Sequence, residues 1–172
     1  MDTEQEEPHR QHRAEVSPCR KYRYVLWREW ENASGSCPVR YAMIVGLNPS
    51  TADETNDDPT VRRCTAFARA WGCGALCMTN LFAYRATEPA LMLAQSDPIG
   101  PDNDDALVRM AANASVIVAA WGIHGNYLGR AAAVKRMLPR LHYLRLTKQG
   151  HPGHPLYLPA TLRPIEWVTV DD

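Results

Sequence analysis

Asparagine residues that could orient a ligand close two apolar runs of the sequence. Asn48 lies in the segment Gly-Leu-Asn-Pro-Ser, directly after the run Tyr41–Gly46, and Asn80 closes the run 75–80. A side-chain amide offers donor hydrogens and an acceptor oxygen, but it does not exchange protons at neutral pH. These residues therefore predict the positioning of a water molecule or the reading of a ligand's polar edge. The competing interpretation is structural, because such amides often bind only backbone.

Three histidines form the second group of residues that could take part in catalysis or ligand binding. His151 and His154 each precede a proline, which restricts the backbone of the residue before it. His124 lies in the glycine-containing turn 122–126. Imidazole can transfer protons, donate a hydrogen bond or bind a metal, and the alternative for all three is a surface loop. Residues 152–158 continue as Pro-Gly-His-Pro-Leu-Tyr-Leu, so His154 alone is followed by an apolar segment.

Alternating apolar runs and amphipathic segments must position these residues. The short apolar runs predict buried strands, and the 3–4 spacing of apolar residues between them predicts helices. Strands are expected over 21–31, 41–46, 75–82, 115–121, 142–146 and 165–170, and helices over 58–71, 89–95, 101–113 and 127–138.

This alternation predicts an α/β fold with a parallel sheet between helices. In open sheets of this kind, ligands bind beyond the carboxyl ends of the strands, where Asn48 and Asn80 are expected. The 172 residues suit one domain, expected over 21–172. Residues 1–20 are polar and predict a disordered or loosely packed tail.

Composition excludes several classes of protein. No apolar run approaches the roughly 20 residues that span a bilayer, and the polar N-terminus predicts no signal peptide. The five cysteines include no CxxC pair, so neither a disulfide framework nor a zinc or iron–sulfur site is expected. We therefore expect reduced thiols, Cys37 among them, in a cytoplasmic protein that does not contact membranes.

Charge is distributed unevenly along a chain whose net charge is zero. The segment 106–165 contains eight Lys and Arg residues and no acidic residue. A local excess of positive charge favours contact with a polyanion, although cations scattered over solvated helix faces would give the same count.

Three segments in this order resemble motifs of the uracil-DNA glycosylase superfamily. They are GLNPS after the first apolar run, Asn80 at the end of a later run, and HPLYL, which begins at His154. The longer signature, which includes GLNPSTADETNDDPT and NLFAYRAT, also resembles a bacterial family described only as a domain of unknown function. We expect that family to be a branch of the superfamily. The resemblance implies a three-layer αβα sandwich around a four-stranded, mainly parallel sheet.

The resemblance also implies a reaction, hydrolysis of the bond between uracil and deoxyribose in DNA during base-excision repair. Asn48 would position the water, helped by the carbonyl of Pro49, and His154 would stabilise the negative charge on the departing base. Asn80 would read the base edge. The other residues expected at the base are Gly46, Leu47, Ser50 and Phe82, with Tyr84, Phe67 and Trp71 as further candidates for stacking on the base.

DNA, single- or double-stranded, is the partner that the resemblance implies. A base must leave the duplex to enter such a pocket. Leu156 and Tyr157 would contact the opened strand, and the phosphates would be held by Arg130, Lys135, Lys148 and His151. Ser50 stands where a tyrosine excludes thymine in other members, so other deaminated or damaged bases are expected substrates. We expect a monomer with no cofactor and no metal.

Three other functions remain open from the residues alone. A nucleoside or nucleotide hydrolase would use the same pocket without a phosphate-binding surface. A non-catalytic nucleic-acid-binding module would keep the fold and lose the chemistry. A small metal hydrolase would bind its ion through His124, His151 and His154.

Overall fold

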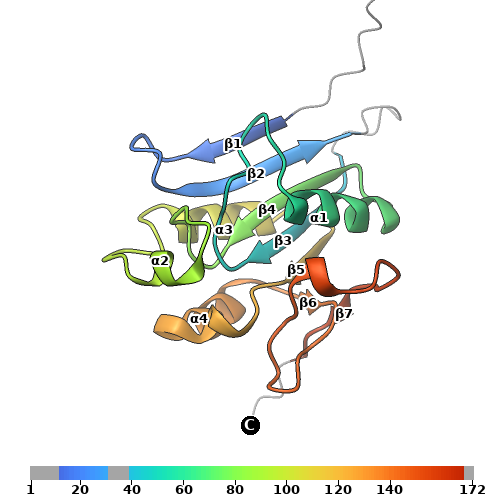
Figure 1. The fold of residues 1–172 in the computed structure, drawn as a ribbon. Helices are drawn as coiled ribbons and strands as arrows, with labels where there is room; N and C mark the ends of the chain where they lie inside the picture. Colours follow the sequence, from blue (N-terminus) through green and yellow to red (C-terminus); the bar gives the residue numbers. More distant parts are fainter. Residues whose placement is uncertain (1–11, 31–38, 169–172) are drawn as a thin grey trace, which may run out of the picture.

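A mixed β-sheet with helices forms the fold in the computed structural model, which describes residues 12–30 and 39–168 (Figure 1). Within these ranges the sheet has seven strands in the order β1-β2-β4-β3-β5-β6-β7. The strands are β1 (His12–Val16), β2 (Arg23–Glu29), β3 (Tyr41–Gly46), β4 (Ala75–Asn80), β5 (Val116–Ala119), β6 (Leu141–Tyr143) and β7 (Ile165–Glu166). The helices are α1 (Pro59–Ala70), α2 (Pro89–Leu93), α3 (Asn103–Ala111) and α4 (Arg130–Met137), with 3-10 segments η1 (Ile123–Gly129) and η2 (Pro155–Tyr157).

Four parallel strands, β4, β3, β5 and β6, form the centre of the sheet. They correspond to four of the predicted apolar runs, so the α/β prediction is confirmed. The prediction of only four strands in the sheet is wrong. β2 pairs antiparallel with β4, β1 pairs antiparallel with β2, and β7 pairs antiparallel with β6. The aromatic and basic strand β2 thus extends the sheet beside β4.

The tail predicted over residues 1–20 is corrected in its second half. His12–Val16 form β1, which pairs antiparallel with β2 from His12 opposite Arg28 to Val16 opposite Arg23, with a register shift between Glu15 and Val16. Alternating polar residues obscured this strand, because an edge strand with one solvated face needs few apolar residues. Residues 1–11 and 31–38, Cys37 among them, lie outside the described residues.

Helices cover both faces of the sheet. One cluster of buried side chains joins the sheet to α2, α3 and α4, and the other joins it to α1 and the segment around Leu158. The α1 side chains in the second cluster, Val61, Cys64, Phe67 and Ala68, follow the predicted 3–4 spacing. Within the described part of the chain, no helix combines the length and apolar character needed to cross a membrane.

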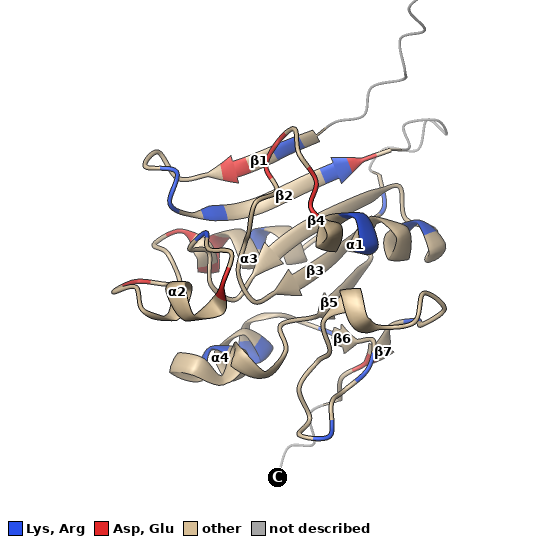
Figure 2. Ribbon diagram, in the orientation of Figure 1, with Lys and Arg blue, Asp and Glu red and all other residues tan. Residues whose placement is uncertain are grey.

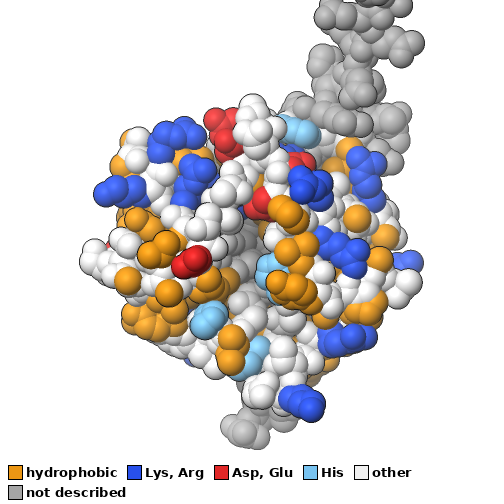
Figure 3. All heavy atoms as spheres, in the orientation of Figure 1, with side chains coloured by type: hydrophobic (Ala, Val, Ile, Leu, Met, Phe, Trp, Pro, Cys, Tyr) orange, Lys and Arg blue, Asp and Glu red, His pale blue; other side chains and the backbone are white. Residues whose placement is uncertain are grey.

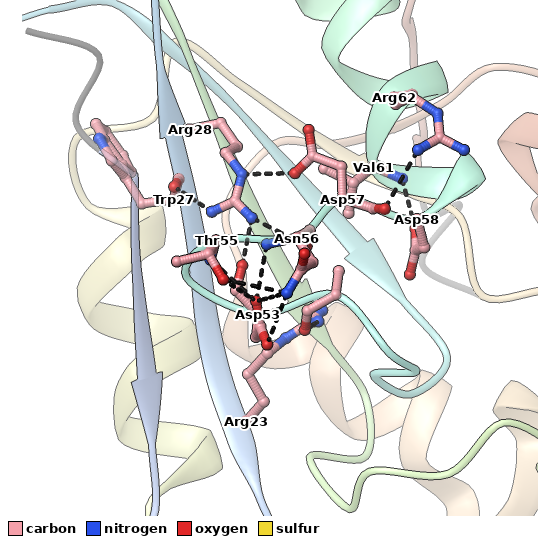
Figure 4. A network of polar contacts seen from close by, with 11 residues as sticks. Arg23, Trp27, Arg28, Asp53, Thr55, Asn56, Asp57, Asp58, Val61 and Arg62 are labelled. Carbon is pink, nitrogen blue, oxygen red and sulfur yellow. Dashed lines mark hydrogen bonds and ion pairs between the residues drawn. The ribbon is translucent and has the colours of Figure 1, made fainter.

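A buried guanidinium ties the loop between β3 and α1 to strand β2 (Figure 4). The Arg28 side chain, 3% exposed, donates from Nε to the carboxylate of Asp57 at 2.7 Å. It also donates to the carbonyls of Asp53, Asn56 and Trp27. Asp53 accepts from the backbone N–H groups of Thr55 and Asn56, which closes a turn inside the loop. The loop is therefore held both by the turn within it and by the hydrogen bonds from Arg28 on β2.

Replacement of this arginine should destabilise the protein. In Arg28→Met the carbonyls lose their donor and Asp57 loses its partner, so we expect the free energy of unfolding to fall by about 3 kcal/mol. The matched control is Arg136→Met, because Arg136 lies exposed on α4. Urea unfolding of both variants measures the difference. Equal denaturation midpoints for the two variants would contradict the anchoring role.

Candidate functional site

A cavity of about 280 Å³ opens beyond the carboxyl ends of β3 and β4. Figure 3 shows this face of the molecule hollowed, with Lys and Arg side chains on both sides of the hollow. The polar residues in the wall include those predicted from three segments far apart in sequence. The residues that line it and that the sequence predicted are Gly46, Leu47, Asn48, Ser50, Asn80, His154, Leu156 and Tyr157.

Asn80 carries a buried donor into this wall. Its side chain is 3% exposed, and its Nδ2 has no hydrogen-bond partner among the described residues. Gly46 pairs with Asn80 in the parallel ladder, and a Cβ at Gly46 would lie 3.0 Å from Asn80 Oδ1. Glycine therefore makes room for the amide. A buried amide donor without a partner costs free energy, which a ligand with an acceptor atom would recover.

Asn48 is held by the backbone that follows β4. Its Nδ2 donates to the carbonyls of Ala86 at 2.9 Å and Pro49 at 3.1 Å. The Pro49 carbonyl also accepts from the N–H of Ala86 at 3.0 Å, so both of its lone pairs are used. Pro49 is buried and is not part of the cavity wall. The prediction that this carbonyl helps to hold a water is therefore corrected, and Asn48 Oδ1 remains as the acceptor.

The hydrogen bonds and burial of His154 favour its neutral form and define one tautomer. Its Nδ1 accepts from the N–H of Leu156 at 3.2 Å, which caps η2. The hydrogen is consequently on Nε2, which is a donor. Burial lowers the pKa of His154 below its ordinary value of 6.5, and the negative charge of Asp58 opposes that shift. At neutral pH the side chain therefore offers a neutral N–H group.

The loop before η2 separates the two predicted histidines. Thr147 N–H donates to the His151 carbonyl at 2.8 Å, and Gly122 N–H donates to the Pro152 carbonyl at 2.9 Å. These bonds form a hairpin-like loop attached to the end of β5. It directs His154 to the cavity, whereas His151 is not part of the wall.

Asp58 and Arg23 are wall residues that the sequence analysis did not assign to the site. Asp58 is the N-cap of α1 and accepts from the N–H of Val61 at 2.9 Å. Arg23 is 3% exposed and donates to the Ala52 carbonyl at 2.7 Å, while its Nε has no partner among the described residues. Burial lowers the pKa of Arg23 to about 10, so it stays charged. The Asp-Pro pair at the start of the predicted helix was the sequence signal that could have identified Asp58.

Cys64 also lines the cavity, but its thiol is not a nucleophile. Burial raises the pKa of Cys64 to about 12, so the reactive thiolate is scarce at neutral pH. Cys64 is a buried free thiol, which agrees with the prediction of reduced thiols.

The aromatic residues proposed to stack on a base are placed elsewhere. Phe82 is fully buried and packs 6.1 Å from the ring of Tyr127, and the structure gives it a core position, not the predicted place at the base. Phe67 stacks on Trp71, and Tyr84 packs edge-on against Tyr22. None of the four candidates lines the cavity. The aromatic that does is Tyr157, 84% exposed and 5.6 Å from the His154 ring.

The Lys and Arg residues of the segment 106–165 are spread over α3, α4 and the segments that follow (Figure 2). Arg130 is buried, donates to the Leu81 carbonyl at 2.8 Å and pairs with Asp104, so its predicted contact with phosphate is replaced by a structural role. Lys135 lies 3.6 Å over the ring of Trp167. Lys148 lies exposed in the loop before His151, and neither lysine lines the cavity. The sequence showed the charges but not their partners.

No group of three or more His, Cys, Asp or Glu side chains within residues 12–30 and 39–168 is arranged to hold a metal ion. The described part of the chain thus gives no support to the metal-hydrolase alternative, which needed His124, His151 and His154 together.

The family described as "Protein of unknown function (DUF1643)" matches residues 23–156. This range includes Asn48, Asp58, Asn80 and His154. No curated protein and no solved structure matches the chain.

The electrostatic environment of His154 predicts its titration. We expect a pKa below 6.5 in the folded protein, since burial disfavours the imidazolium. Asp58→Asn should lower that pKa further, because the Asp58 charge favours the imidazolium. NMR detection of the His154 ring against pH measures both values. A pKa at or above 6.5, or one that Asp58→Asn leaves in place, would contradict this description of the cavity.

Proposed function

The chain belongs to the DUF1643 family, and we propose that it is a DNA glycosylase that hydrolyses the N-glycosidic bond of uracil. It would act in base-excision repair in the cytoplasm, as a monomer without cofactor. The observation that carries the proposal is one cavity in which the buried, unpartnered amide of Asn80 lies with the neutral donor His154. The sheet-and-helix architecture is compatible with the αβα sandwich of the uracil-DNA glycosylase superfamily.

The Asn80 amide suits the edge of uracil. Its free Nδ2 can donate to O4, and its Oδ1 can accept from N3–H. Cytosine presents an amino donor and an N3 acceptor at these positions and so reverses both demands. A buried amide whose bonds are unmade by the wrong base rejects that base strongly. Recognition of uracil by Asn80 also requires glycine at position 46, because a side chain there would displace Asn80 Oδ1.

Departure of the base leaves negative charge on it, and the wall offers positive and neutral donors for that charge. His154 Nε2–H can donate to O2 of uracil without itself losing a proton. Arg23 adds a buried positive charge in the same wall. Donors fixed before the reaction stabilise developing charge without reorganisation, which is the largest contribution in many enzymes.

The mouth of the cavity suits a strand from which one nucleotide has been extruded. Leu156 and Tyr157 lie exposed at the wall, where they can fill the gap that the base leaves in the stack. Arg62 and Arg63 follow the wall residues Thr60 and Val61 on α1, and Arg85 precedes Ala86. Arg62 and Arg85 can contact phosphates beside the extruded nucleotide, whereas Arg63 donates to the Leu158 carbonyl.

Uracil release from labelled oligonucleotides tests the proposal. Pure protein in EDTA should excise uracil from single- or double-stranded DNA, detected as alkali cleavage at the abasic site. His154→Asn keeps an acceptor for the Leu156 N–H but cannot donate at the Nε2 position, so we expect the rate to fall about 10²–10³-fold. His124→Asn, the matched control at an exposed histidine outside the cavity wall, should keep the wild-type rate. Folded wild-type protein that releases no uracil would reject the proposal, and free nucleosides and plain DNA binding would then be assayed.

Ser50 predicts the range of bases that are removed. It lies half-buried in the wall and leaves space that a larger side chain would fill. We expect the wild type to release hypoxanthine and xanthine as well as uracil, and Ser50→Tyr to lose the two purines at least tenfold more than uracil. Parallel assays with the three oligonucleotides measure this ratio. An unchanged ratio would show that Ser50 does not limit the pocket.

A further inference from the structure

The proposed reaction needs an acceptor for the proton of the attacking water, and the cavity offers few. Asn48 is an amide and takes no proton at neutral pH. The Pro49 carbonyl already accepts two hydrogen bonds. His154 Nδ1 accepts from the Leu156 N–H, and its Nε2 carries a hydrogen. The residues singled out from the sequence therefore hold the base and a water, but none of them can accept the proton.

Asp58 is the single acidic residue among the described residues that line the cavity. One of its oxygens caps α1 through the Val61 N–H, and its carboxylate forms no other hydrogen bond with the described residues. Its charge acts on three other wall residues, since it opposes the burial-driven pKa shifts of His154 and Arg23 and adds to that of Cys64. The carboxylate thus lies near the other charged and polar groups of the wall.

An N-cap alone would account for an aspartate at this position, but a second observation places Asp58 in a ligand site. The unpartnered Nδ2 of Asn80, on a side chain that is 3% exposed, belongs to the wall of the same cavity. A ligand that engages Asn80 therefore enters the space that Asp58 borders. The two residues come from β4 and from the start of α1.

The loop before Asp58 fixes the carboxylate in place. Asp57 is bound by Arg28 at 2.7 Å, and Asp53 closes the turn that precedes it (Figure 4). A catalytic carboxylate must be held within a fraction of an ångström, and a rigid supporting loop provides that.

We propose that Asp58 is a catalytic residue of the reaction, an inference that rests on the proposed function. The oxygen of water forms a bond to C1′, while the bond from C1′ to N1 breaks and its electron pair leaves with the uracil anion. The water proton passes to the Asp58 carboxylate and then to solvent. Before that transfer, the negative carboxylate stabilises the positive charge that develops on the sugar.

Binding of charged and neutral abasic analogues tests this role without turnover. The probes are two duplexes, one with a cationic pyrrolidine in place of the deoxyribose and one with neutral tetrahydrofuran. The wild type should bind the pyrrolidine duplex at least tenfold more tightly, since a transition-state charge mimic binds better than its neutral analogue. Asp58→Asn keeps the capping oxygen, so it should fold normally, and it should reduce the preference to within about twofold.

Glu54→Gln is the matched control, because Glu54 lies in the same loop, exposed and away from the cavity wall. It should keep the full preference. The inference is overturned if the wild type shows no preference or if Asp58→Asn retains it. Uracil release, measured alongside, separates the two claims. An active wild type whose rate and preference both survive in Asp58→Asn rejects the role of Asp58 alone, whereas a wild type that releases no uracil and binds neither duplex rejects both.

Discussion

The burial of Arg28 is the constraint on which the arrangement of the cavity depends. A guanidinium taken out of water needs its hydrogens bonded, and here three carbonyls and the Asp57 carboxylate meet that need. Three of these acceptors belong to the loop that joins β3 to α1, so the charge on β2 determines where the loop lies. The start of α1, and with it Asp58, is positioned as a consequence.

Backbone pairing fixes the other side of the cavity in the same manner. Beyond the end of β3 and β4, the carbonyls of Gly46, Leu47 and Pro49 accept from the N–H groups of Leu81, Phe82 and Ala86. This continues the contact between the two segments past the formal strands and holds Asn48 next to Asn80. Asn103 at the start of α3 and Arg130 at the start of α4 both donate to the carbonyl of Leu81, the residue that follows β4. The two asparagines of the cavity therefore rest on a rigid edge of the sheet.

The sequence predicted the parts of the site that follow from the parallel sheet. Since carboxyl ends of parallel strands meet at one edge, the residues after Tyr41–Gly46 and at Asn80 had to be neighbours. The sequence did not predict the features that depend on contacts between distant segments. The sequence around Asp58 predicts a helix cap, which it is, and only the course of the loop brings it into the cavity wall that His154 also lines. Arg130 reads as a free cation, because its partner Asp104 lies 26 residues earlier. β1 was not predicted, because an edge strand with polar alternation contains few apolar residues, whereas β2 was predicted within 21–31.

The central claim is that the cavity recognises uracil through the amide of Asn80. The most direct test is the NMR signal of the Asn80 side-chain NH₂ during titration of the protein with free uracil and, separately, free cytosine. The account predicts that uracil shifts this signal in a saturable manner and that cytosine at the same concentrations leaves it in place. Equal shifts with both bases, or no shift with either, would contradict the claim.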